Sequence, residues 1–342
     1  MQNAAQTLFG PYPDWLTFTL AHPVSLPEPR SVELPDGACI SLTGAGILHL
    51  TPASPMTETG LIVSAGVHGN ETAPIEVLNR LITELLAGQW VLKRPTLVML
   101  GNPPAMIAGT RFVDFNLNRL FQGAHQQPPY VGRPEANRAA ELEAACRRFA
   151  GQIPRLVHYD LHTAIRPSRR EKFALYPFVA GRRFPPSGLN FLAASDVHTL
   201  LLQHKTGTTF SSFSSSTLGA ESLTIELGQV RPFGENDLTR FAGIEGSLRQ
   251  HMQGLDPTRE TPDTEVMVFE VVEEIINTGE GFRFHVPDDV ANFTEYPPGT
   301  LIWEDGQDAY RVGEEPEAII FPNRDVPIGQ RVGLLVRQQA RT

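Results

Sequence analysis

The order of hydrophobic and polar positions changes character about fifty residues into the chain. Before that point, short β-prone runs alternate with segments rich in Pro, Thr and Ser. Runs of this length, bounded by turn-forming residues, are typical of hairpins and edge strands. The pattern therefore predicts β hairpins within residues 1–50. Their strands are expected at 15–20, 31–34, 38–42 and 46–50.

A different alternation occupies residues 61–252. The continuous apolar run at 61–67 predicts a buried strand. A helix is predicted next, at about 72–86, because Ile75, Leu78 and Ile82 recur at helical spacing. Further strands are predicted at 96–100, 155–161, 173–179, 198–203 and 223–227, and further helices at 134–149 and 235–252. Strands that alternate with helices predict an α/β fold in which helices flank a mixed sheet.

The pattern changes again beyond about residue 256. A polar, linker-like stretch at 258–263 precedes closely spaced strand candidates, with a turn at 298–299. These candidates lie at 266–272, 282–285, 301–303, 318–321 and 331–335. We therefore expect two domains, a larger α/β domain at 1–255 and a smaller all-β domain at 256–342.

Composition limits the location and the partners of the protein. Of its 342 residues 41% are apolar and 19% are charged, which is typical of a folded chain. Its two cysteines are too few for a disulfide framework. The chain contains no run of about 18 apolar residues, so no membrane-spanning helix is expected. The first ten residues lack the pattern of an export signal. We expect a cytoplasmic protein with no membrane insertion. Homo-oligomerisation is left open.

The charged residues are distributed unevenly. A formal net charge of −10 disfavours binding to nucleic acid, whose phosphates need a basic surface. Residues 257–342 hold 17 acidic and 7 basic side chains, whereas residues 101–200 hold 13 basic and 7 acidic ones. The middle of the chain is thus locally positive and suits a small anionic substrate.

A His-Gly-Asn-Glu sequence follows the first predicted buried strand. His68 and Glu71 lie across the turn from strand to helix, where open α/β sheets bind their ligands. Imidazole nitrogens and carboxylate oxygens are both good zinc ligands, and Gly69 permits a tight turn. The alternative interpretation is that His68 caps the helix and Glu71 complements the helix dipole.

The strand predicted at 155–161 carries a second group of polar residues. A catalytic zinc site needs three protein ligands and one open position, and a histidine at the end of another strand would supply the third ligand. His162 is favoured over His158, because His162 lies at the end of the strand and His158 lies inside it. Asp160 is interpreted either as a carboxylate that orients a ligand or as a buried polar group near the site.

Glu226 lies within the apolar run at 223–227. Glutamate is rarely buried without a partner. The functional interpretation is a general base whose pKa is raised by a desolvated pocket. The alternative is a structural partner for one of the arginines.

The segment 111–119 combines two arginines with two asparagines. The planar guanidinium group binds carboxylates through two parallel hydrogen bonds. The segment therefore suits an anionic substrate, and a solvated turn is the alternative.

Taken together, these motifs resemble the succinylglutamate desuccinylase/aspartoacylase family of zinc carboxypeptidase-like hydrolases. The resemblance runs from about residue 45 to 250 and continues less sharply to the C-terminus. Extended matches favour the desuccinylase branch. They lie at 66–76, 158–166, 173–177 and 226–234.

The resemblance implies one zinc ion per subunit, held by His68, Glu71 and His162. It implies that Glu226 acts as general base and acid. The implied reaction is hydrolysis of N-succinyl-L-glutamate to succinate and L-glutamate, which is the last step of arginine catabolism by the succinyltransferase route.

The resemblance also implies that Arg111, Asn118 and Arg119 contact the substrate, with Arg111 assisting at the carbonyl oxygen. The sequence departs from the aspartoacylase branch at two places. Ser216 stands where that branch has an arginine, and the substrate-binding tyrosine near the C-terminus of that branch has no clear equivalent here, although Tyr310 is a candidate. Both departures favour a succinyl over an acetyl substrate. The alternatives are an aspartoacylase-like N-acyl-aspartate hydrolase, a peptide carboxypeptidase, and a non-catalytic zinc- or carboxylate-binding module.

Overall fold

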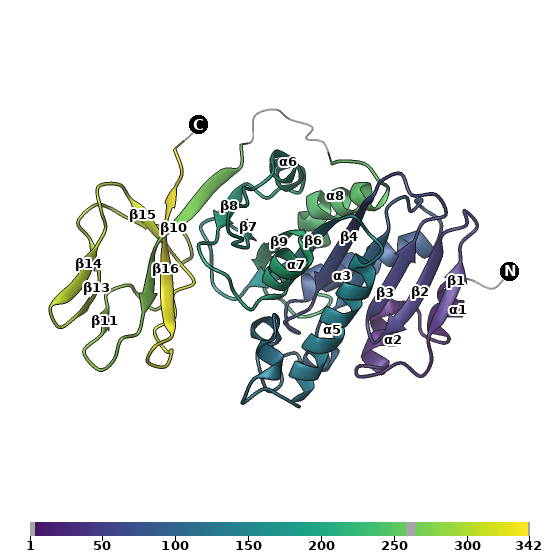
Figure 1. The fold of residues 1–342 in the computed structure, drawn as a ribbon, viewed down its shortest axis with the longest axis horizontal. Helices are drawn as coiled ribbons and strands as arrows, with labels where there is room; N and C mark the ends of the chain where they lie inside the picture. The colour runs from purple at the N-terminus through teal and green to yellow at the C-terminus, as the bar shows by residue number, and fades with distance from the viewer. Residues whose placement is uncertain (1–3, 258–264, 341–342) are drawn as a thin grey trace.

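One large β-sheet runs through the molecule (Figure 1). The computed structural model describes residues 4–257 and 265–340, and the linker predicted at 258–263 lies outside them. Within the described residues this sheet has 13 strands, in the order β1-β2-β3-β5-β4-β6-β9-β7-β8-β10-β16-β15-β12. The strands are β1 (Arg30–Glu33), β2 (Cys39–Gly44), β3 (Ile47–Thr51), β4 (Thr59–Ala65), β5 (Thr96–Leu100), β6 (Arg155–Ala164), β7 (Lys172–Tyr176), β8 (Thr199–Leu202), β9 (Glu221–Gln229), β10 (Met267–Ile276), β12 (Thr294–Tyr296), β15 (Glu317–Ile320) and β16 (Arg331–Gln338).

The centre of this sheet is parallel. β4 pairs in parallel with β5 on one side and with β6 on the other, and β6 pairs in parallel with β9. β4 and β5 are buried along almost their whole length, as expected for parallel strands covered by helices on both faces. The carboxyl ends of β4, β6 and β9 therefore lie side by side at one edge of the sheet.

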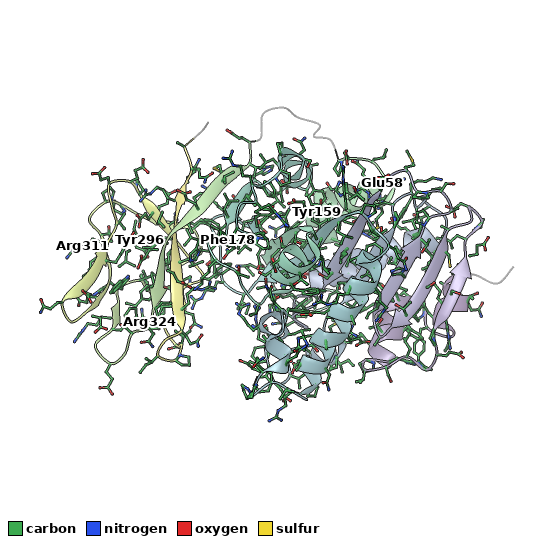
Figure 2. All side chains as sticks on the ribbon, viewed as in Figure 1. Glu58, Tyr159, Phe178, Tyr296, Arg311 and Arg324 are labelled. Carbon is green, nitrogen blue, oxygen red and sulfur yellow. The ribbon has the colours of Figure 1, made fainter. Side chains whose placement is uncertain are left out.

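Helices cover both faces of the central strands. One face carries α1 (Ala4–Phe9), α2 (Trp15–Ala21), α3 (Thr72–Leu86), α4 (Pro103–Ala108), α6 (Pro186–Ala194), η3 (Leu238–Phe241) and α8 (Ala242–Met252). The other face carries η1 (Leu117–Arg119), α5 (Pro134–Ala150) and α7 (Phe210–Leu218), with η2 (Ala124–Gln126) after η1. Tyr159 of β6, labelled in Figure 2, packs within the first layer and stacks on Phe191 with ring centroids 3.9 Å apart. No described helix is long and apolar enough to cross a membrane.

The predicted fold class is confirmed, but the strand predicted at 15–20 is wrong. These residues form helix α2. The side chain of Asp14 accepts a hydrogen bond from the N–H of Thr17 at 2.7 Å and so caps the helix. Trp15, Phe18 and Thr19 recur at helical spacing on the buried side. The aromatic and Thr-rich composition suggested a strand, whereas the cap and the spacing of the buried residues are those of a helix.

Helix α7 has no counterpart among the predicted elements. Five of its nine residues are serine, and serine hydroxyls compete with the backbone hydrogen bonds of a helix. The helix forms because Thr209 caps its first turn, accepting from the N–H of Ser212 at 3.2 Å. Phe210 and Phe213 then pack in the hydrophobic layer beneath the sheet.

The C-terminal part of the chain extends the large sheet. β10 pairs in parallel with β8 of the larger domain and antiparallel with β16. β15 and β12 follow β16 in the same sheet, and β11 (Arg283–Phe284), β13 (Leu301–Asp305) and β14 (Asp308–Arg311) form a separate three-stranded sheet. The predicted all-β character is confirmed, and a continuous strand ladder joins this part to the larger domain.

Candidate functional site

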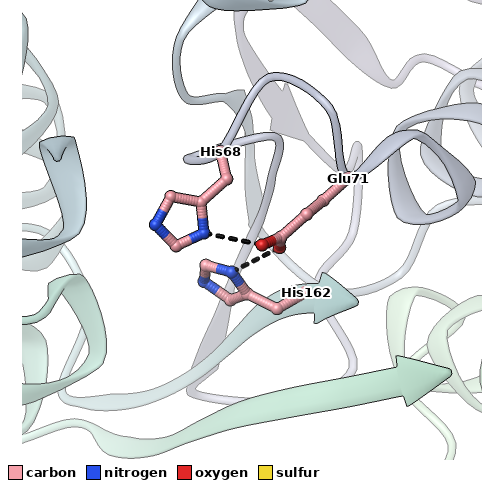
Figure 3. Close-up of side chains that lie close together, drawn as sticks. All are labelled: His68, Glu71 and His162. Atoms are coloured by element: carbon pink, nitrogen blue, oxygen red, sulfur yellow. Dashed lines mark hydrogen bonds and ion pairs between the residues drawn. The ribbon is translucent and has the colours of Figure 1, made fainter. Parts of the chain in front are cut away.

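Three polar side chains meet at the carboxyl edge of the central strands (Figure 3). His68 lies three residues after β4, Glu71 directly precedes α3, and His162 lies near the end of β6. Nδ1 of His68 lies 2.8 Å from Oε1 of Glu71, and Nδ1 of His162 lies 2.8 Å from Oε2 of the same carboxylate. All three side chains are buried, and one ligand atom from each lies within 4.8 Å of the other two. The three residues can therefore share one ion.

The turn that carries His68 depends on glycine at the next position. A Cβ atom on residue 69 would lie 2.2 Å from the carbonyl carbon of Ala105 in α4. The N–H of Gly69 also donates to the carbonyl oxygen of Arg111 at 3.1 Å. Because only glycine tolerates this close approach, the turn packs directly on α4 and on the start of the 111–119 loop.

The Nε2 atoms of the two imidazoles, which point away from Glu71, each have a hydrogen-bond partner. Nε2 of His68 donates to Oδ1 of Asn116 at 2.9 Å, and Nε2 of His162 donates to Oδ2 of Asp160 at 3.0 Å. A proton held on Nε2 leaves the Nδ1 lone pair for a cation. Nδ1 of His68 is buried and lies 2.8 Å from a Glu71 oxygen, and it has no well-aligned hydrogen-bond partner among the described residues. Two imidazoles and a carboxylate in this arrangement fit a divalent cation such as zinc.

The electrostatics of the cluster favour a cation at the same point. Burial acts to lower the pKa of His162, but the charges of Asp160 and Glu71 raise it well above the ordinary histidine value. Burial acts to raise the pKa of Glu71, but the charges of His68 and His162 bring it well below the ordinary value. Two buried carboxylates thus flank His162 and stabilise positive charge there.

Asp160 begins a buried chain of hydrogen bonds that no sequence pattern reveals. Its Oδ1 accepts from Oγ of Ser64 at 2.6 Å, and that hydroxyl lies 2.9 Å from Nε2 of His158. Nδ1 of His158 lies 2.7 Å from Oγ of Ser214. All four side chains are fully buried, and burial lowers the pKa of His158 to about 4. His158 is therefore a neutral member of this chain and does not belong to the converging cluster.

Glu226 of β9 stands beside the cluster. It is the register partner of His162 in the β6–β9 ladder, so both side chains leave the sheet on the same face. Oε2 of Glu226 is buried and has no hydrogen-bond partner among the described residues. Burial, followed by the negative charge of Glu71, raises the pKa of Glu226 to about 7. A carboxylate with this pKa can take up and release a proton near neutral pH.

The 111–119 loop brings Arg111 against the cluster. Nη1 of Arg111 donates to Oε1 of Glu71 at 2.6 Å, and 31% of the arginine side chain is exposed. In η1, Nδ2 of Asn118 lies 3.5 Å from Nε2 of His162. Arg119 follows and donates from Nη1 to the carbonyl oxygen of Asn118 at 2.9 Å. Arg111 and Asn118 thus touch members of the cluster, and Arg119 is next to them.

Glu135, which no sequence pattern singles out, shapes this loop. It lies in the first turn of α5 and is 3% exposed. Its carboxylate accepts from the N–H groups of Val113, Asp114 and Phe115 at 2.6, 3.1 and 3.0 Å. The only signal in the sequence is a Pro-Glu pair at a helix start, and this pair does not disclose a partner about twenty residues away.

The two positions that depart from the aspartoacylase branch are occupied by other contacts. Ser216 lies on α7, and its hydroxyl oxygen lies 2.6 Å from the carbonyl oxygen of Ser212 and 2.9 Å from Oε1 of Gln122, either of which can accept its single proton. The hydroxyl of Tyr310 donates to Oε2 of Glu317 at 2.9 Å within the C-terminal domain. Neither side chain belongs to the converging cluster.

Comparison with known proteins matches both parts of the chain. Residues 58–252 match the succinylglutamate desuccinylase/aspartoacylase catalytic domain, and residues 264–339 match the AstE/AspA barrel-sandwich hybrid domain. A succinylglutamate desuccinylase of Shewanella piezotolerans is 40% identical over 329 residues, which cover 95% of each chain. One from Shewanella pealeana is 41% identical over the same length and coverage.

Solved structures agree with these matches. The structure is similar to a succinylglutamate desuccinylase of Vibrio parahaemolyticus, with a TM-score of 0.88 and 32% identity over 97% of this chain and 96% of that chain. It is also similar to one of Chromobacterium violaceum, with a TM-score of 0.84 and 36% identity over 96% and 99% of the two chains.

Proposed function

The chain belongs to the succinylglutamate desuccinylase/aspartoacylase family, and from this premise we propose that it hydrolyses N-succinyl-L-glutamate to succinate and L-glutamate. The observation that carries the proposal is the buried, partnerless oxygen of Glu226 beside the converging His68, Glu71 and His162. A site that only binds does not need a general base, so this observation favours catalysis over a zinc- or carboxylate-binding module.

We propose that His68, Glu71 and His162 hold one zinc ion per subunit. Two histidines and one glutamate form a three-ligand set that is typical of catalytic zinc, in which a fourth position stays open. Zinc in such a set lowers the pKa of a bound water to about 7 and polarises a carbonyl group. The hydrogen bonds from the two Nε2 atoms orient the rings for this task.

Glu226 is proposed to carry the proton through the reaction. Its partnerless carboxylate takes a proton from water as the water oxygen attacks the amide carbon. It then donates that proton to the nitrogen of glutamate as the carbon–nitrogen bond breaks. A pKa near 7 suits both transfers. Arg111 stands beside Glu71 and is placed to stabilise negative charge that develops on the carbonyl oxygen.

The substrate carries three carboxylates, which is the proposed reason for the arginines of the 111–119 loop. Arg111, Asn118 and Arg119 are assigned to substrate binding. Ser216 leaves no arginine at the aspartoacylase position, which favours the succinyl substrate over N-acetylaspartate. From the family alone we place the reaction at the last step of arginine catabolism by the succinyltransferase route, in the cytoplasm.

Steady-state kinetics of the zinc-loaded protein test this proposal. We expect kcat/KM for N-succinyl-L-glutamate to exceed that for N-acetyl-L-aspartate and for peptides with a free C-terminal residue. Glu226→Gln should keep its zinc and lose about 10²-fold or more in kcat. Glu221→Gln is the matched control. Glu221 lies at the other end of β9, and its carboxylate accepts a hydrogen bond from the hydroxyl of Tyr176. Preference for another substrate, or full activity of Glu226→Gln, would overturn the assignment.

A further inference from the structure

Ser64 of β4 lies directly beside Asp160 of β6. The two residues are register partners in the parallel β4–β6 ladder, and both side chains are fully buried. The Ser64 hydroxyl donates to Oδ1 of Asp160 at 2.6 Å, while Oδ2 of the same carboxylate accepts from Nε2 of His162 at 3.0 Å. Asp160 thus offers one oxygen to each neighbour, and its orientation toward His162 depends on what holds the other oxygen.

The hydrogen bond between Ser64 and Asp160 can run in only one direction. An ionised carboxylate accepts hydrogen bonds and cannot donate them, so the single hydroxyl proton of Ser64 goes to Asp160. The same hydroxyl oxygen lies 2.9 Å from Nε2 of His158. Because its proton is already used, Ser64 must accept in this second contact. Nε2 of His158 therefore carries a proton and donates it to Ser64.

The other nitrogen of His158 fixes the far end of this chain of hydrogen bonds. The ring is neutral, because burial lowers the pKa of His158 to about 4, and a neutral imidazole has one donor and one acceptor. With the proton on Nε2, Nδ1 accepts from the hydroxyl of Ser214 in α7, which lies 2.7 Å away. That contact is shorter than those of the same hydroxyl with the carbonyl oxygens of Phe210 and Ser211, at 3.3 and 3.1 Å. Every donor in the chain therefore points toward Asp160.

We propose that Ser64 is a positioning residue for the metal ligand His162. The inference rests on the zinc ligands of the proposed function and deepens that function. The Ser64 hydroxyl holds one oxygen of Asp160 and so directs the other oxygen at Nε2 of His162, which keeps Nδ1 of that ring on the side of Glu71. His158 and Ser214 keep the hydroxyl proton of Ser64 on Asp160. Helix α7 thereby supports the metal site through a chain of hydrogen bonds.

The first test measures the zinc affinity of Ser64→Ala by competition with a chromogenic chelator. Groups that orient a ligating histidine typically contribute 10- to 100-fold to metal affinity, so the variant is expected to bind zinc about 10-fold or more weakly than the wild-type protein. Ser64→Cys, which keeps only a weak donor of similar shape, should lie between the two.

Ser211→Ala is the matched control for the loss of a buried hydroxyl. The side chain of Ser211 is 1% exposed, and its hydroxyl pairs with that of Thr224 at 2.6 Å, outside the chain. This variant should bind zinc like the wild-type protein. Equal zinc affinities of Ser64→Ala and the wild-type protein, or an equal loss in Ser64→Ala and Ser211→Ala, would overturn the inference. If the wild-type protein itself binds no zinc, the ligand set of the proposed function fails.

The second test reads the direction of the chain in the wild-type protein without added metal. The ¹⁵N resonances of histidine side chains distinguish the two neutral tautomers, and the signal of His158 is identified by its absence from His158→Ala. We expect a neutral ring with its proton on Nε2. A proton on Nδ1 would make the Ser64 hydroxyl the donor to His158 and take its proton from Asp160, which would overturn the inference whatever the variants do.

Discussion

The two histidines of β6 differ in what surrounds them, and that difference decides what each can do. His162 has a carboxylate beside each ring nitrogen, that of Glu71 at Nδ1 and that of Asp160 at Nε2. His158 has two hydroxyl groups, those of Ser64 and Ser214. Carboxylates raise the basicity of an imidazole and favour a cation, whereas hydroxyls only satisfy a buried neutral ring. His162 rather than His158 is therefore proposed as the metal ligand because of the carboxylates that surround it.

Replacing each histidine in turn tests this difference. His162→Ala is expected to abolish stoichiometric zinc binding, because it removes one of three ligands. His158→Ala is expected to keep its zinc but to lower the free energy of unfolding by about 1–3 kcal/mol, because two buried hydroxyls lose a partner. Zinc content of dialysed protein and thermal unfolding measure the two effects. The reverse pattern would exchange the roles of the two histidines.

At the scale of elements, a side chain of helix α5 holds the 111–119 loop in place. The carboxylate of Glu135, at the start of α5, gathers three successive N–H groups of the loop. Arg111 precedes these groups and Asn118 follows them, so one carboxylate fixes the loop between two residues proposed to contact the substrate. A loop held in this way keeps its binding groups in place before the substrate arrives.

Glu135→Gln should loosen the loop and leave the fold intact. The amide retains the shape of the side chain but loses the charge that strengthens the three hydrogen bonds. We expect kcat/KM to fall by about 10-fold or more through misplacement of Arg111 and Asn118. Glu141→Gln on the same helix, where the carboxylate pairs with Arg138, is the control and should stay near the wild-type value. Equal kinetics for both variants would show that Glu135 does not position the loop.

At the scale of the whole molecule, the two parts of the chain are structurally continuous. β10 continues the ladder of β8, and one hydrophobic cluster combines residues of both parts. Asn292 of the C-terminal domain adds a further connection to the segment after β6. Its N–H donates to the carbonyl oxygen of Pro167, and its carbonyl oxygen accepts from the N–H of Arg169, each at 2.9 Å. Its side chain, 1% exposed, accepts from the N–H of Phe321 at 2.8 Å.

This continuity predicts a single cooperative unfolding transition. Asn292→Ala removes the side-chain acceptor of a buried N–H group and should lower the free energy of unfolding by about 1–3 kcal/mol. We expect the melting temperature of the whole molecule to fall by several degrees without a split in the transition. Asn323→Ala, which removes an exposed turn contact in the same domain, should change it little. Two separate calorimetric transitions in either variant would contradict the prediction.

The effect of the uneven charge distribution can be judged only from the whole molecule. Residues 257–342 account for the whole formal charge of −10, which by itself disfavours contact with an anionic substrate. Burial, followed by the charges of Arg331 from this acidic region and of Arg111, nevertheless lowers the pKa of Arg119 to about 10. A net charge averaged over a domain thus conceals the sign of the charge that acts on a single group.

The sequence by itself determined the α/β fold class, the position of most strands and helices, and the residues that end the central strands. These features follow from local periodicity, because the pattern of apolar residues repeats every two residues in a strand and every 3.6 in a helix. The proposed ligands could be predicted for the same reason, since His68, Glu71 and His162 stand where predicted strands end. The cap of α2 and the burial of the serine-rich α7 lay outside such patterns.

Only the tertiary structure decided which partner each polar group has. Ser64 meets Asp160 across 96 positions of the chain, and Phe210 meets Asn118 across 92. The charge of Arg331 acts on Arg119 from a different domain. Buried polar groups must find partners wherever packing places them, and packing is set by contacts between distant segments. For that reason the ends of the strands could be predicted from the sequence, whereas the hydrogen bonds and charges that give the site its chemistry could not.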